Sequence, residues 1–167
     1  MSRRSGLFLA LVLLGACQGG GGHATVDAGV CPLHDDAGGL DAGTNVDVVD
    51  RFLATRDSEA QEACRCASDV PFCLSQTAPP PTTAQRACLD GTFDSDLPAF
   101  TQATVCLEGA VSRYLACATP HACAEVAARQ ACKATYEVEG SACFACLSGP
   151  ERLALVGCLG TVGDAGM

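Results

Sequence analysis

The sequence is poor in the side chains that usually build a hydrophobic core. Its 167 residues include no tryptophan, two tyrosines and six phenylalanines. Alanine instead dominates the segments with helical periodicity. Alanine buries little area, and burial contributes only about 25 cal/mol per Å². We therefore expect the fold to need a second source of stability.

Basic residues are also few. Ten lysines and arginines stand against nineteen acidic residues, which gives a formal net charge of −9. A chain of this charge lacks the basic surface that binds the phosphates of nucleic acid. It also lacks the polybasic cluster that binds anionic lipid head groups. We therefore expect no nucleic-acid partner.

The sequence has no long hydrophobic run. Its apolar segment at residues 7–14 follows Arg3 and Arg4. As a helix this segment would span about 12 Å, whereas a transmembrane helix needs about 20 apolar residues. A charged start and a short apolar stretch are instead typical of a secretory signal peptide. We predict that residues 1–16 are this peptide and that the protein is exported.

The motif Leu14-Gly15-Ala16-Cys17 resembles the lipobox of bacterial lipoproteins. The resemblance implies that the Cys17 thiol receives a diacylglyceryl group and that the chain is cut just before it. Two or three acyl chains would then anchor the protein to a membrane. Gln18 occupies the position where Asp marks inner-membrane retention in that family, so the resemblance favours the bacterial outer membrane. The alternative is an ordinary signal peptide with an incidental cysteine.

Cysteine supplies the missing stability. Loss of residues 1–16 leaves eight basic and nineteen acidic residues, a formal charge of −11, and twelve cysteines besides Cys17. An even number in an exported chain indicates a disulfide framework, and each disulfide adds roughly 2–4 kcal/mol. The predicted disulfide cysteines are Cys31, Cys64, Cys66, Cys73, Cys88, Cys106, Cys117, Cys123, Cys132, Cys143, Cys146 and Cys158.

Two segments look unstructured. Residues 17–43 begin with the lipidated cysteine and continue as a glycine-, alanine- and aspartate-rich stretch, which is typical of a flexible linker. Asp-Ala-Gly recurs in it, but the spacing does not match a calcium-binding loop. Residues 161–167 are predicted to be a disordered tail.

The folded domain is predicted at residues 44–160 and is all-α. Thr44 or Asn45 caps a helix that runs to about Ala67. The segment 77–83, which is proline-rich, forms a stiff connector. The remaining helices are expected after Thr83 to Gly91, from near Asp96, from Thr119-Pro120 to Gly140, from Ser141 to Gly149, and from Glu151 to Leu159. The fold class is therefore a disulfide-rich set of helical hairpins.

Two long helices should form an antiparallel hairpin around a turn near Thr119. Cys117 and Cys123 lie almost symmetrically about that turn, as do Cys106 and Cys132. This arrangement is broadly similar to twin-cysteine helical hairpins, the CHCH-type and α-hairpinin domains. The resemblance implies the pairs Cys117–Cys123 and Cys106–Cys132. The spacing differs from the CHCH pattern, because ten and then eight residues separate the cysteines.

Several residues are candidates for chemistry. Cys143 and Cys146 form a C-x-x-C motif, which suits a redox pair or half a zinc site, although structural disulfides are the favoured interpretation. Cys64 and Cys66 lie two residues apart on opposite helix faces, which favours bonds to different partners. His34, near Cys31, and His121, near Cys123, are weaker metal or nucleophile candidates.

No hydrolase, phosphate-loop or zinc-protease motif occurs in the sequence. We therefore predict a non-catalytic, membrane-anchored lipoprotein without metal or cofactor, which serves in binding or in envelope structure. Its partner would be an unidentified protein or polysaccharide. The alternative is a periplasm-facing thiol-redox or metal-binding protein that uses Cys143 and Cys146.

Overall fold

The structure is a computed structural model that describes residues 44–160. Within this range the regular structure is helical and no strand occurs, which confirms the prediction of an all-α fold. The predictions for residues 1–43, including Cys17, Cys31 and His34, and for residues 161–167 lie outside the described residues. The helices are α2 (Asn45–Cys64), α3 (Val70–Thr77), α4 (Thr83–Ser95), α5 (Leu97–Ala118), α6 (Val126–Cys143), the short 3-10 helix η2 (Phe144–Cys146) and α7 (Gly149–Gly160).

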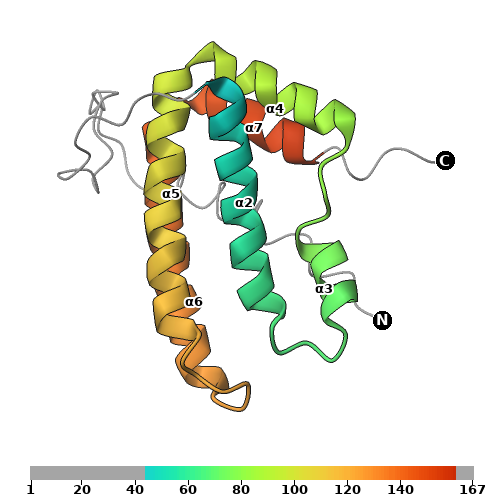
Figure 1. The fold of residues 1–167 in the computed structure, drawn as a ribbon. Coiled ribbons are helices and arrows are strands. Elements are labelled where there is room, and N and C mark those ends of the chain that lie inside the picture. Colours follow the sequence, from blue (N-terminus) through green and yellow to red (C-terminus); the bar gives the residue numbers. More distant parts are fainter. Residues whose placement is uncertain (1–43, 161–167) are drawn as a thin grey trace.

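Three long helices form the body of the domain (Figure 1). Helices α2 and α5 run in the same direction, and α6 returns antiparallel to α5. Helices α4 and α7 pack together across one end of these three helices, at the top of the view. Helix α3 lies beside the other half of α2. The turn between α5 and α6 therefore lies at the end opposite α4 and α7.

The helix starts follow local sequence signals. Thr44, one of the two predicted caps, begins α2 in a reciprocal pair of hydrogen bonds with Asp47. Asp96 caps α5, and Pro98 occupies its first turn, where a missing N–H costs nothing. Thr82 caps α4 together with Gln85. These caps satisfy backbone N–H groups that no intrahelical partner could reach.

The predicted C-terminal end of α4 was wrong. Gly91 does not stop the helix, which continues to Ser95. Leu89 and Phe93 are one turn apart and both are buried, so continuing the helix places two large side chains in the core. That burial offsets the roughly 1 kcal/mol that a glycine costs within a helix.

The sequence-based bounds of the C-terminal helices were also wrong. Helix α6 begins at Val126 rather than at Thr119, because residues 119–125 form turns in which His121 and Glu125 donate N–H groups to Ala118 and Ala122. The same helix continues through Gly140 to Cys143, where the expected helix from Ser141 is replaced by η2. The last helix, α7, spans Gly149–Gly160, close to its predicted position.

The core is built from a few aromatic rings and closely packed alanines. The rings of Phe52 and Phe93 have centroids 5.6 Å apart, and those of Phe93 and Phe100 are stacked at 4.4 Å. These rings come from α2, α4 and α5. Buried alanines continue the contact between the long helices, namely Ala60, Ala103, Ala110 and Ala118. Small side chains at these positions let the helix backbones approach closely.

Five disulfides connect the helices within residues 44–160. Cys64–Cys73 joins α2 to α3, and Cys88–Cys158 joins α4 to α7. Cys66–Cys123 joins the segment after α2 to the α5–α6 turn. Two further bonds, Cys106–Cys143 and Cys117–Cys132, join α5 to α6. A network of cross-links thus supplements a core that has little aromatic area.

The predicted hairpin pairing was wrong, although the hairpin does carry two nested disulfides. Cys117 pairs with Cys132 and Cys106 with Cys143, so Cys123 takes no part in the hairpin. Cys106 and Cys117 are eleven residues apart, and so are Cys132 and Cys143. Eleven residues are close to three helical turns, so each helix presents both of its cysteines on one face. Cys123 lies in the turn between the two helices, so it does not belong to either of these cysteine pairs.

We expect Phe93→Ala to lower the free energy of unfolding by about 3–5 kcal/mol, because it leaves a cavity between two other rings. Phe72→Ala is the matched control, since Phe72 on α3 is 64% exposed. Urea denaturation should show a change within about 0.5 kcal/mol for the control. Equal effects of the two substitutions would contradict the assignment of the core.

Candidate functional site

The C-x-x-C motif does not form one disulfide. Cys143 is fully buried and is bonded to Cys106 of α5. Cys146 is also disulfide-bonded. Neither sulfur is therefore a thiolate that could ligate zinc or attack a substrate. The prediction for Cys64 and Cys66 is confirmed, because they bond to different partners, Cys73 and Cys123.

His121 lies in the turn between α5 and α6. Its Nδ1 is 3.7 Å from the carboxylate of Glu125, which also accepts a hydrogen bond from the N–H of Ala122. Within the described part of the chain, no group of three or more His, Cys, Asp or Glu side chains is arranged to hold a metal ion. The structure therefore does not bring His121 into a metal cluster with other described residues.

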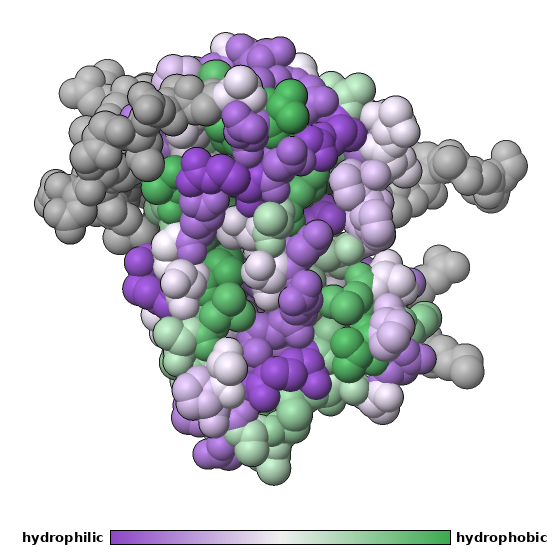
Figure 2. All heavy atoms as spheres, in the orientation of Figure 1, coloured by the Kyte–Doolittle hydropathy of each residue, from purple (hydrophilic) through white to green (hydrophobic). Residues whose placement is uncertain are grey.

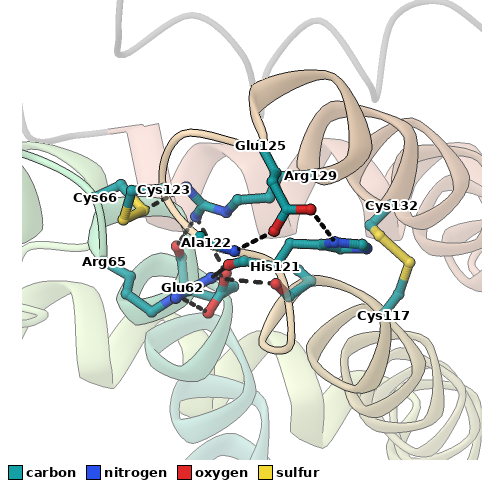
Figure 3. Close-up of polar contacts among 11 residues, drawn as sticks. Glu62, Arg65, Cys66, Cys117, His121, Ala122, Cys123, Glu125, Arg129 and Cys132 are labelled. Carbon is teal, nitrogen blue, oxygen red and sulfur yellow. Dashed lines mark hydrogen bonds and ion pairs between the residues drawn. A yellow bond between two sulfur atoms is a disulfide. The ribbon is translucent and has the colours of Figure 1, made fainter.

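A buried charged cluster lies at this end of the domain, and we call Glu62, Arg65 and Arg129 the arginine–glutamate cluster (Figure 3). Glu62 is only 5% exposed. Arg65 donates from Nε to both of its carboxylate oxygens, at 3.1 and 2.9 Å. Arg129 of α6 donates from Nη2 to Oε1 of Glu62 at 3.1 Å and to its backbone carbonyl at 3.0 Å. A buried carboxylate needs such partners, because its desolvation is costly.

The arginine–glutamate cluster also holds the turn. Arg65 Nη2 donates to the carbonyl oxygens of Ala118 and His121, at 3.1 and 2.8 Å. One guanidinium thus binds the end of α2, the end of α5 and the following turn. No local sequence pattern predicts the cluster, because Glu62 and Arg129 are 67 residues apart.

The Cys66–Cys123 disulfide lies beside this cluster. Arg129 Nη1 is 2.6 Å from the Sγ atom of Cys66, so the guanidinium contacts both the disulfide and Glu62 (Figure 3). Cys123 lies on the exposed turn, whereas Cys66 is half-buried. The site therefore combines an accessible sulfur, a shielded sulfur and a fixed positive charge.

A second polar contact joins α2 to α6. The Tyr136 hydroxyl donates to Oε2 of Glu59 at 3.0 Å, and its ring stacks on Tyr114 of α5 with a centroid distance of 5.1 Å. Burial raises the pKa of Glu59, although the Tyr136 hydrogen bond opposes this shift. Burial and the nearby Glu59 carboxylate also raise the pKa of Tyr136. The pair therefore favours a protonated tyrosine that donates to the carboxyl group.

A small hollow lies between α5 and α6, beside this pair. It has a volume of about 70 Å³ and is lined by Tyr114, Tyr136 and the Cys117–Cys132 disulfide. Sites for small organic ligands are usually about 300–1,000 Å³. The hollow is thus too small for a ligand of that kind.

The surface mixes hydrophilic and hydrophobic residues (Figure 2). On the face shown, hydrophobic atoms gather over α3, where Phe72 is exposed. Among the described helices, no single one is long and apolar enough to cross a membrane, although the bent pair formed by residues 126–146 and α7 meets the length and composition test.

Compared with known proteins, the chain matches no protein family, no curated protein and no solved structure. All eleven cysteines within residues 44–160 are disulfide-bonded, so this region holds no free thiol nucleophile. Its distinctive chemical feature is the disulfide that contacts a guanidinium.

We expect Glu62→Ala to lower the free energy of unfolding by about 3 kcal/mol, because two arginines lose the carboxylate that neutralises them in a buried setting. Asp94→Ala is the control, since Asp94 is an exposed acidic residue of α4. It should change the free energy by no more than about 0.5 kcal/mol in urea denaturation. A Glu62→Ala protein as stable as this control would show that the cluster contributes little.

Glu59 should make stability depend on pH. Its folded pKa lies above the ordinary value of 4.5, so the unfolded chain releases this proton first as the pH rises. The free energy of unfolding should therefore fall until Glu59 has also ionised in the folded protein. Glu59→Gln keeps an acceptor for Tyr136 and removes this loss. Its advantage over the wild type should thus grow from about pH 4 to about pH 7.

Tyr136→Phe should have the opposite effect on this pH dependence. It removes the hydrogen bond that lowers the pKa of Glu59, so the decline with pH should become larger than in the wild type. Urea denaturation across the same pH range measures all three proteins. Parallel curves for the wild type and Glu59→Gln would contradict the raised pKa.

Proposed function

We propose that this chain is an exported, lipid-anchored and non-catalytic protein whose helical domain serves in binding or in envelope structure. The observation that carries the proposal is the oxidised state of the cysteines, since all eleven within residues 44–160 are disulfide-bonded. Structural disulfides persist in oxidising compartments outside the cytosol. They thereby support export, which the charged and apolar segments before Cys17 predict independently.

The lipobox-like motif supports attachment to a membrane. Leu14-Gly15-Ala16-Cys17 places a nucleophilic thiol directly after small residues. A diacylglyceryl group with further acylation would give stable anchoring, whereas one chain alone binds only marginally. Gln18 supports the outer membrane in preference to the inner one.

A binding or structural role agrees with the form of the domain. Its helices are cross-linked at both ends, and its hollow between α5 and α6 is too small for a drug-sized ligand. A rigid surface of this type presents contacts to a macromolecule without a large loss of conformational entropy. We therefore propose a protein or polysaccharide partner and no bound cofactor.

Metabolic labelling tests the anchor. Cells that express the full chain with radiolabelled fatty acid should yield a labelled protein that sediments with membranes, because Cys17 carries the acyl groups. Cys17→Ser should lose the label. Cys31→Ser is the matched control, since it makes the same substitution at the other cysteine before residue 44. It should keep the label when the signal is normalised to protein on an immunoblot.

Undiminished label in Cys17→Ser would overturn the lipid anchor. Fractionation of the labelled cells into inner and outer membranes tests the location separately. Recovery of the labelled protein only in the inner membrane would contradict the role given to Gln18, and it would leave the anchor itself supported.

A further inference from the structure

Three of the described disulfides expose one of their two cysteines. They are Cys88–Cys158, Cys117–Cys132 and Cys66–Cys123, in which Cys88, Cys117 and Cys123 are exposed. Their partners Cys158 and Cys132 are buried, and Cys66 is half-buried. A thiolate from solution could therefore approach one sulfur of each bond. Exposure alone does not distinguish the three.

The shielded sulfur of Cys66–Cys123 contacts a charged group. Arg129 Nη1 contacts the Sγ atom of Cys66 at 2.6 Å, and Cys158 Sγ lies 3.3 Å from the hydroxyl of Thr92. A guanidinium is always charged and stabilises a thiolate beside it. A disulfide is cleaved faster when the sulfur that leaves is the more stable thiolate.

The charge around Cys66 remains positive despite the nearby glutamate. Arg65 and Arg129 carry two positive charges, and Glu62 carries one negative charge that both arginines contact. Glu125 in the turn accepts a hydrogen bond from the Ala122 N–H and lies beside His121 (Figure 3). One net positive charge of the arginine–glutamate cluster is thus available to a thiolate at Cys66.

We propose that Cys66–Cys123 is a thiol-exchange site of this domain, in which Cys123 receives the incoming thiol and Cys66 is the leaving sulfur. A thiolate attacks Cys123 Sγ, a new S–S bond forms to Cys123, and the Cys66–Cys123 bond breaks. Cys66 leaves with the electron pair as a thiolate beside Arg129. A second thiol then attacks the mixed disulfide, releases the oxidised thiol pair and leaves Cys123 reduced.

The structure favours reversal of this reaction. Arg65 holds the turn to the end of α2 through the carbonyls of Ala118 and His121, independently of the disulfide. Cys117–Cys132 also closes the hairpin near the turn. The two thiols therefore stay close after reduction, and the Cys66 thiolate can attack a mixed disulfide at Cys123. The expected partner is an exported thiol or a thiol–disulfide protein.

Limited reduction of the full mature protein tests the proposal without any substitution. The protein is treated with reduced glutathione at low excess, quenched by alkylation and mapped by mass spectrometry. Cys66–Cys123 should open about tenfold faster than Cys117–Cys132 and Cys88–Cys158, because Arg129 stabilises its leaving thiolate. Equal rates, or earlier opening of either other bond, would overturn the proposal.

The position of the glutathione adduct tests the direction of attack. We expect the adduct on Cys123, since that sulfur is exposed. A predominant adduct on Cys66 would overturn the assigned direction.

Arg129→Gln tests the role of the charge. It should slow the opening of Cys66–Cys123 to the rate of the other exposed disulfides, while the helical circular dichroism signal remains. Arg113→Gln is the matched control, since Arg113 is an exposed α5 arginine that pairs with Glu139. It should leave the rate unchanged. An unchanged rate in folded Arg129→Gln would overturn the part played by the guanidinium.

These outcomes are separate from the proposed function. Loss of acyl label in Cys17→Ser concerns the anchor alone. The order of disulfide opening can be measured whether or not the chain carries lipid, so either proposal can fail without the other.

Discussion

The rest of the domain depends on the doubly cross-linked hairpin of α5 and α6. Its two disulfides have the same register, because the cysteines of each helix are eleven residues apart and thus share one face. Helix α2 packs against α5 of this hairpin, and α5 also supplies Phe100 to the aromatic core. A chain with so little aromatic area gains stability here by restricting the unfolded state through covalent links.

Charged groups join the helices at one end of the domain, and aromatic rings join them at the other end. Near α4 and α7, three phenylalanine rings from α2, α4 and α5 pack against one another. At the α5–α6 turn, two arginines and a buried glutamate join α2, α5, α6 and the turn. Hydrogen bonds compensate for the desolvation of these charges. The same arrangement places a positive charge beside one disulfide, which links packing to the chemistry proposed for Cys66 and Cys123.

Local signals in the sequence predicted the helices better than the contacts between them. Helices α2 and α5 begin where expected, next to Thr44 and Asp96, because a helix start depends on residues within one turn. Gly91 misled the prediction, since the burial of Phe93 outweighed a local preference. Most of the site could not be predicted from the sequence. Cys66 was a predicted disulfide cysteine, but the positions of Glu62 and Arg129 beside it arise from helix packing.

The sequence by itself determined the all-helical class and the need for disulfides, because periodicity, caps and a shortage of aromatic residues are properties of the local chain. Only the tertiary structure decided which cysteines meet. Disulfide formation requires two Cα atoms to lie within about 7 Å, and Cys66 and Cys123 reach 5.4 Å across 57 residues. That approach depends on how α2 packs along the α5–α6 hairpin, which no short stretch of sequence encodes.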